Sequence, residues 1–126
     1  MPAKSGEHVS CVYVVHFPDA NAIKIGCAQF AHRRLNTISK DFGLPDYENG
    51  YLLRGPCSRD IHKIEKKLQK SVHEFTIAPT NNMNQVIRGS GESEFFEPTS
   101  MSIILIELFK VAKKCKGTVI SGIPRK

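Results

Sequence analysis

The first third of the chain shows two runs of β-forming residues followed by a helical pattern. The runs Cys11–Phe17 and Ala22–Cys27 are rich in β-branched and aromatic residues, and they flank the turn-forming segment Pro18–Asn21. This pattern predicts an antiparallel hairpin. From about Ala28 to Lys40 the apolar residues recur at helical spacing, which predicts a helix that stops at the glycine and proline of Phe42–Pro45.

The remaining pattern predicts further strands and two more helices. Tyr47–Arg54 reads as a third strand, although its Asn49-Gly50 pair leaves a turn as the alternative. A second helix is expected from an N-cap at Ser58, with a buried stripe formed by Ile61, Ile64, Leu68, Val72 and Phe75.

The last third begins with a loop and ends with a strongly apolar helix. Thr76–Gly91 reads as a long loop with a short strand at Gln85–Arg88, and Ser93–Glu97 as a short strand or bend. Met101–Lys114 is apolar over much of its circumference near its start, so we expect a deeply packed third helix.

These elements predict an α+β fold in which a small antiparallel sheet is flanked by about three helices. The sheet would consist of the hairpin plus one or two further strands. With 126 residues, one domain is expected. We expect a polar leader at residues 1–10, the domain at residues 11–116 and a basic tail at residues 117–126.

Composition indicates the chemistry of the partner and the cellular compartment. The formal net charge is +6, which favours an acidic partner, most commonly nucleic acid. The four cysteines form no C-x-x-C pair and no histidine spacing completes a zinc pattern around them, so we expect small buried apolar residues. The sequence has no signal-peptide pattern and no apolar run of membrane-spanning length, so a reducing, cytoplasmic setting is expected.

Two charged residues interrupt the predicted apolar stripes. Arg34 lies four residues after Phe30 and four before Ile38, and Glu65 lies at the edge of the second helical stripe. A charge against a core needs a partner. Arg34 and Glu65 could pair with each other or reach water past the stripe edge. Alternatively, Arg34 binds an anion and Glu65 holds a hard cation such as Mg²⁺, which usually takes a carboxylate and several waters.

The order of these motifs resembles the GIY-YIG nuclease superfamily. The chain has V-Y-V in the first strand, K-I-G ending at Gly26, Arg34 eight positions later and Glu65 on the next long helix. It is most similar to the phage-associated DNA-binding branch, in which K-I-G is the usual second motif and a terminal strand corresponds to Glu94 and Phe96. The resemblance covers most of the chain and implies a small sheet flanked by helices that cuts DNA with one divalent cation.

The resemblance implies a role for each matching residue. Tyr13 stands at the first motif's tyrosine, which positions or activates the attacking water, and Lys24 stands where most members have a second tyrosine. Arg34 matches the arginine that binds the scissile phosphate. Glu65 matches the glutamate that holds Mg²⁺ or another divalent cation. The predicted activity is therefore metal-dependent endonuclease hydrolysis of double-stranded DNA, in which Tyr13 or a desolvated Lys24 moves a proton.

The chain also departs from the family pattern. Cys11 replaces the glycine of the first motif, Lys24 replaces the second tyrosine, and the asparagine that follows the metal-binding glutamate has no clear counterpart. Tyr13 could simply pack on the hairpin, and Lys24 could be a solvent-facing strand lysine. Two rival functions stay open: a catalytically inactive nucleic-acid-binding module and a protein-binding inhibitor on the same scaffold. The residues expected to contact DNA backbone are Arg33, Lys63, Lys66, Lys67 and Lys70.

Overall fold

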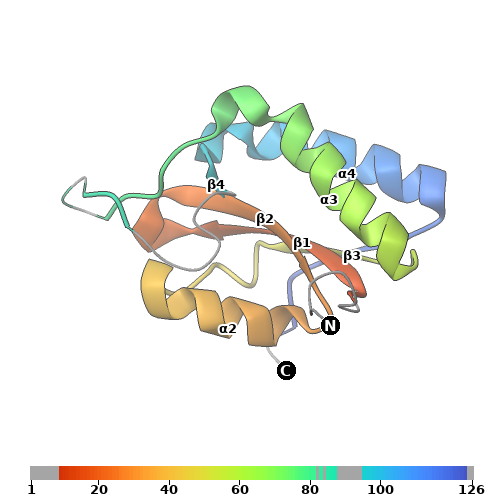
Figure 1. Cartoon of the computed structure of the whole chain (residues 1–126), viewed down its shortest axis with the longest axis horizontal. Helices are drawn as coiled ribbons and strands as arrows, with labels where there is room; N and C mark the ends of the chain where they lie inside the picture. Colours follow the sequence, from red (N-terminus) through yellow and green to blue (C-terminus); the bar gives the residue numbers. More distant parts are fainter. Residues whose placement is uncertain (1–8, 82, 84, 88–94, 125–126) are drawn as a thin grey trace.

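A five-stranded antiparallel sheet forms the centre of the computed structural model, which describes residues 9–81, 83, 85–87 and 95–124 (Figure 1). The strand order is β4-β2-β1-β3-β5. The strands are β1 (Cys11–Phe17), β2 (Ala22–Ala28), β3 (Tyr51–Arg54), β4 (Phe95–Phe96) and β5 (Thr118–Ser121).

The predicted hairpin is confirmed as the pair β1 and β2. The two strands pair along their whole length, from Cys11 opposite Ala28 to Phe17 opposite Ala22. A single 3-10 turn, Pro18–Ala20, joins them, and Asn21 completes the turn in the left-handed region with φ 53°. Asparagine tolerates this conformation better than most residues, so the turn chemistry and the strand pattern agree.

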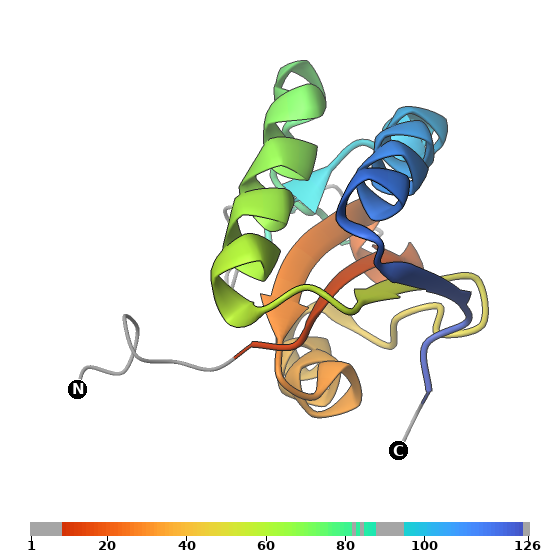
Figure 2. The same cartoon turned by 90° about the vertical axis from the view of Figure 1, so that its right-hand side faces the viewer.

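Helices cover both faces of the sheet (Figures 1 and 2). Helix α2 (Ala31–Phe42) packs on one face, and helices α3 (Ser58–Ser71) and α4 (Met101–Cys115) pack on the other. Because side chains alternate along a strand, Tyr13 joins the core beneath α2, whereas Val12 and Val14 join the core beneath α3 and α4. The expected α+β fold, a small sheet with three helices, is confirmed.

The sheet has five strands, one more than the four expected at most from the sequence. Within the predicted basic tail, Thr118–Ser121 forms β5 and pairs with β3, with Tyr51 opposite Ser121. Lys116 ends α4 in the left-handed region with φ 59° and turns the chain back. The next residue is Gly117, and a Cβ built on it would lie 2.8 Å from Leu53 Cδ1. The chain therefore passes close to β3 at a point where a side chain would clash.

Several element boundaries differ from the sequence pattern. Strand β2 continues to Ala28, so α2 begins at Ala31. The turn alternative for Asn49-Gly50 is confirmed, since the Gly50 amide donates to the Tyr47 carbonyl at 3.2 Å and β3 begins at Tyr51.

The start of α3 and the packing of α4 also correct the sequence expectations. The N-cap of α3 is Cys57 and not Ser58, whose hydroxyl donates to the Val9 carbonyl at 2.8 Å. Helix α4 is not buried all round. It packs Ile104, Leu108, Val111 and Ala112 against the sheet, whereas Ile103, Ile106 and Phe109 are exposed.

Some expectations fall partly outside the described residues. Of the strand expected at Gln85–Arg88, Val86 forms an isolated bridge with Thr80, and Arg88 lies outside the described residues. Of Ser93–Glu97, Phe95–Phe96 is strand β4, and Ser93 and Glu94 lie outside, as do residues 1–8 of the expected leader. Within the described ranges, no helix combines the length and hydrophobicity that a membrane span requires.

Candidate functional site

Tyr13 occupies the centre of the sheet on the face covered by α2. It lies opposite Gly26 in the register of the hairpin, and only 1% of its surface is exposed. A Cβ built on Gly26 would lie 2.6 Å from Tyr13 Cζ. The phenol therefore rests on the backbone of β2, at a point where any side chain would displace it.

Lys24 lies two residues before Gly26 and points to the same face. It pairs with Val15, its exposed fraction is 1%, and its Nζ lies 5.6 Å from the centroid of the Phe95 ring. This separation is within the range of a cation–π contact. The alternative of a solvent-facing strand lysine is therefore wrong: Lys24 and Tyr13 are buried on one face of the hairpin.

Arg34 lies at the edge of the buried face of α2. The helix packs Ala31, Leu35, Ile38 and Phe42 against the sheet, and Arg34, which directly precedes Leu35, is half-buried. Arg33 is exposed, and its guanidinium carbon lies 4.7 Å from the centroid of the Phe30 ring. The expected division between an inward Arg34 and an outward Arg33 matches this burial.

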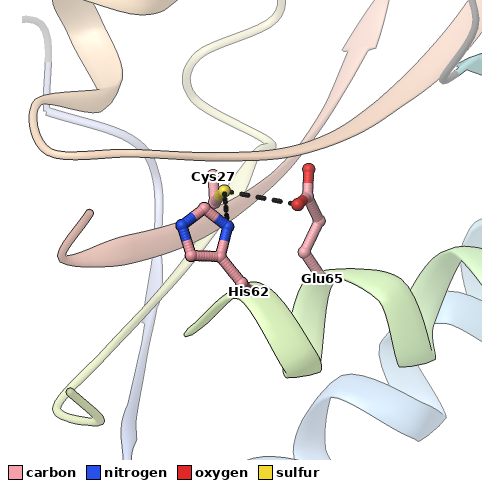
Figure 3. A group of neighbouring side chains, drawn as sticks. All are labelled: Cys27, His62 and Glu65. Atoms are coloured by element: carbon pink, nitrogen blue, oxygen red, sulfur yellow. Dashed lines mark hydrogen bonds between the residues drawn. The ribbon is translucent and has the colours of Figure 1, made fainter. Parts of the chain in front are cut away.

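Glu65 lies on the other side of the sheet, where α3 packs against β2. Its Oε1 accepts a hydrogen bond from the Cys27 thiol at 3.3 Å, and the same sulfur lies 3.6 Å from His62 Nδ1 (Figure 3). His62 and Glu65 are three residues apart on α3 and so share a helix face. Cys27 points toward them from β2, and all three residues are half-buried.

Gln69 connects this cluster to the backbone of β2. Its Nε2 donates to Glu65 Oε2 at 3.4 Å and to the Ile25 carbonyl at 3.1 Å. The Gln69 amide thus serves a strand carbonyl and helps fix the orientation of the Glu65 carboxylate.

The site residues predicted from the sequence therefore divide between two faces. Tyr13 and Lys24 come together beneath α2, and Arg34 lies on α2 itself. Glu65 lies on α3 and faces Cys27 of β2, a residue to which the sequence analysis assigned no chemistry. The contacts of the Glu65 carboxylate with Cys27 and Gln69 differ from the alternative in which it pairs with Arg34.

Lysines from α3 and α4 gather around a hollow between the two helices. Its volume is about 470 Å³, and Lys67, Glu107 and Lys110 are among its lining residues. Lys67 Nζ lies 3.8 Å from Glu107 Oε2. A second hollow of about 350 Å³ shares Lys67. The lysines that line one or both hollows, here called the α3–α4 lysine groove, are Lys63, Lys67, Lys110, Lys113 and Lys114.

A sequence model of the T5orf172 domain matches residues 10–118, which include the hairpin, all three helices and strand β4. The chain belongs to the T5orf172 domain family. This phage-associated domain is related to nuclease-type folds, in agreement with the resemblance at the coarser level. Comparison with curated proteins and with solved structures gave no match.

The donor atoms around Glu65 indicate which cation this T5orf172 domain can hold. Mg²⁺ prefers oxygen ligands in an octahedral arrangement, and thiolate sulfur selects softer metals. A cation bound at Glu65 Oε1 would lie beside a sulfur and an imidazole nitrogen. The set Cys27, His62 and Glu65 thus does not fit Mg²⁺, and it fits a softer divalent cation.

Proposed function

We propose that this T5orf172 domain binds double-stranded DNA and hydrolyses its phosphodiester bonds with the help of a divalent cation. The observation that carries this proposal is that Tyr13, which lies on Gly26, and Lys24 are both buried on one face of the hairpin. Membership of a family related to nuclease-type folds supports it.

Phosphodiester hydrolysis needs a proton acceptor for water, positive charge near the phosphate and a proton for the leaving oxygen. Tyr13 and Lys24 are the candidates for moving protons, and their burial keeps bulk water away from them. Arg34 can hold two phosphate oxygens at once through its planar guanidinium. Glu65 would hold the divalent cation on the opposite face of the sheet from Tyr13 and Lys24, and the cation would supply positive charge from that side.

The α3–α4 lysine groove supplies a surface for the DNA backbone. Its five lysines outnumber the two acidic residues, Asp60 and Glu107, that line the same hollows. Such a cluster attracts phosphates without reading sequence. Three further basic residues expected to contact DNA are also exposed: Arg33, Lys66 and Lys70.

One observation favours a second candidate, a nucleic-acid-binding module without catalysis. Tyr13 and Lys24 each expose only 1% of their surface, and Phe95 lies over Lys24. A scissile phosphate must reach the groups that transfer its protons. In this second function the two buried residues stabilise the hairpin, and the lysine groove alone binds DNA.

Incubation of supercoiled DNA with the protein and with Mg²⁺, Mn²⁺ or Zn²⁺ in separate reactions tests the proposal. Hydrolysis predicts nicking that is lost in both Arg34→Ala and Glu65→Ala. Salt-dependent binding without nicking under any of these conditions would replace the proposal by the non-catalytic module. Failure to bind nucleic acid at low salt would contradict both and favour a protein-binding inhibitor.

A further inference from the structure

We propose that Cys27, His62 and Glu65 form a zinc-binding site. The three residues offer one sulfur, one nitrogen and one oxygen, and these ligand atoms all lie within 4.8 Å of one another (Figure 3). Zn²⁺ binds thiolate, imidazole and carboxylate ligands together, so the chemistry of this set matches that ion. The inference concerns metal binding alone and does not require that the domain cleaves DNA.

The distances agree with one shared ion. In a tetrahedral zinc site, with Zn–S of about 2.3 Å and Zn–N and Zn–O of about 2.0 Å, neighbouring ligand atoms lie about 3.3–3.6 Å apart. The Cys27 sulfur is 3.6 Å from His62 Nδ1 and 3.3 Å from Glu65 Oε1. The two pairs that include the sulfur therefore already have the spacing that coordination requires, and the His62 and Glu65 ligand atoms lie within 4.8 Å of each other.

The fold makes the site from two rigid elements. His62 and Glu65 lie one turn apart on α3, and Cys27 lies on β2, against which α3 packs. Ligands on helices and strands are held more firmly than ligands on loops. Gln69 donates to Glu65 Oε2 and leaves Oε1 directed at the sulfur, so it acts as a positioning residue of the kind that supports metal ligands.

The same three residue types also occur in cysteine nucleophile sites, but the contacts differ. In such a site the carboxylate orients the histidine, and the histidine contacts the thiol. Here Glu65 accepts its hydrogen bond from Cys27 itself. Zinc binding would replace this hydrogen bond with coordination by both residues, and the thiol proton would pass to solvent. Three protein ligands and a water would complete four-coordination.

Metal titration of the tag-free, reduced and chelator-stripped full chain tests the site. Zn²⁺ is titrated in competition with a chromophoric chelator, and Co²⁺ is used as a spectroscopic substitute. We expect one Zn²⁺ per chain and a thiolate-to-cobalt charge-transfer band. Cys27→Ser, His62→Ala and Glu65→Gln should each lower zinc affinity by about 100-fold or more, and Gln69→Ala by about tenfold. Mg²⁺ should not compete.

Cys57→Ser is the matched control. The Cys57 thiol also contacts a carboxylate of α3, Asp60 Oδ2 at 3.5 Å, but Cys57 is exposed and belongs to no three-ligand group among the described residues. This variant should keep full zinc affinity and the cobalt band. Unchanged affinity in folded Cys27→Ser or His62→Ala, or loss of the cobalt band in Cys57→Ser, would overturn the proposal. Because the readout is metal binding without DNA, this result is independent of nicking.

Discussion

The ring of Tyr13 lies on the backbone of Gly26, its cross-strand partner in the hairpin. The strand pair can accommodate this large buried side chain because the opposite residue has none. Lys24, two residues before Gly26, is buried on the same face of β2 because side chains alternate along a strand. The Tyr13–Gly26 contact therefore matters both for the stability of the hairpin and for the position of one proposed proton-transfer group.

Gly26→Ala should destabilise the domain. The added methyl group would lie 2.6 Å from Tyr13 Cζ, so the ring or the strand must move. Overpacking of this kind typically costs about 1–3 kcal/mol of unfolding free energy. Urea denaturation measures the cost. In a Tyr13→Leu background the same substitution should cost less, and an equal cost in both backgrounds would show that the ring is not the cause.

Removal of charge from the α3–α4 lysine groove should weaken the salt dependence of DNA binding. Each lysine that contacts a phosphate contributes about 0.9 to the slope of log affinity against log salt, so Lys110→Ala with Lys114→Ala should lower it by about 1.8. Fluorescence anisotropy at several salt concentrations measures the slope. Lys40→Ala, in the last turn of α2, removes an exposed charge elsewhere and should leave the slope unchanged. Equal effects at both places would contradict a DNA-binding groove.

Alkaline pH should destabilise the fold in part through Cys11. The thiol donates a hydrogen bond to the Ala28 carbonyl at 3.2 Å. Burial raises the pKa of the Cys11 thiol above its ordinary value of 9.0. Above that pH the unfolded chain loses the proton before the folded chain does. Stability is therefore full below about pH 9 and falls as pH rises toward the folded-state pKa, by at most about 1.4 kcal/mol per pH unit.

Urea unfolding of wild type and Cys11→Ala between about pH 8 and pH 10 isolates this contribution. The variant loses packing at every pH but should show a shallower decline at alkaline pH. Val15→Ala, which removes packing from the same buried cluster without removing a thiol, should follow the wild-type pH dependence. Parallel curves for wild type and Cys11→Ala would show that ionisation of the Cys11 thiol does not contribute to the pH dependence of the unfolding free energy.

The elements that local pattern determines were predictable. The β1–β2 hairpin and helix α4 follow from alternation, turn residues and helical spacing, and their bounds differ from the prediction by one residue at most. Strand β5 was missed because it depends on a partner more than 60 residues away and on the left-handed turn at Lys116. Neither condition is visible in the short run Thr118–Ser121.

The two candidate sites also differ in how far the sequence predicts them. Tyr13, Lys24 and Arg34 follow from motif order, but the burial of Lys24 depends on Phe95, which joins the sheet from the other end of the chain. Cys27 lies 35 residues before His62, so a search for short zinc spacings passes over it. Alternation does place Cys27 on the face of Ile25, and helical spacing aligns His62 with Glu65. Only the packing of α3 on β2 brings these residues together.

The rate at which supercoiled DNA is nicked by Arg34→Ala, compared with Lys40→Ala, tests the proposed hydrolysis most directly. Both substitutions remove one positive charge from α2, but only Arg34 lies at the edge that packs on the hairpin. Loss of a group that stabilises transition-state charge typically costs about 10²–10³-fold in rate. We predict such a loss for Arg34→Ala and wild-type nicking for Lys40→Ala. Equal rates in the two variants, or no nicking by the wild-type protein with any divalent cation, would contradict the account.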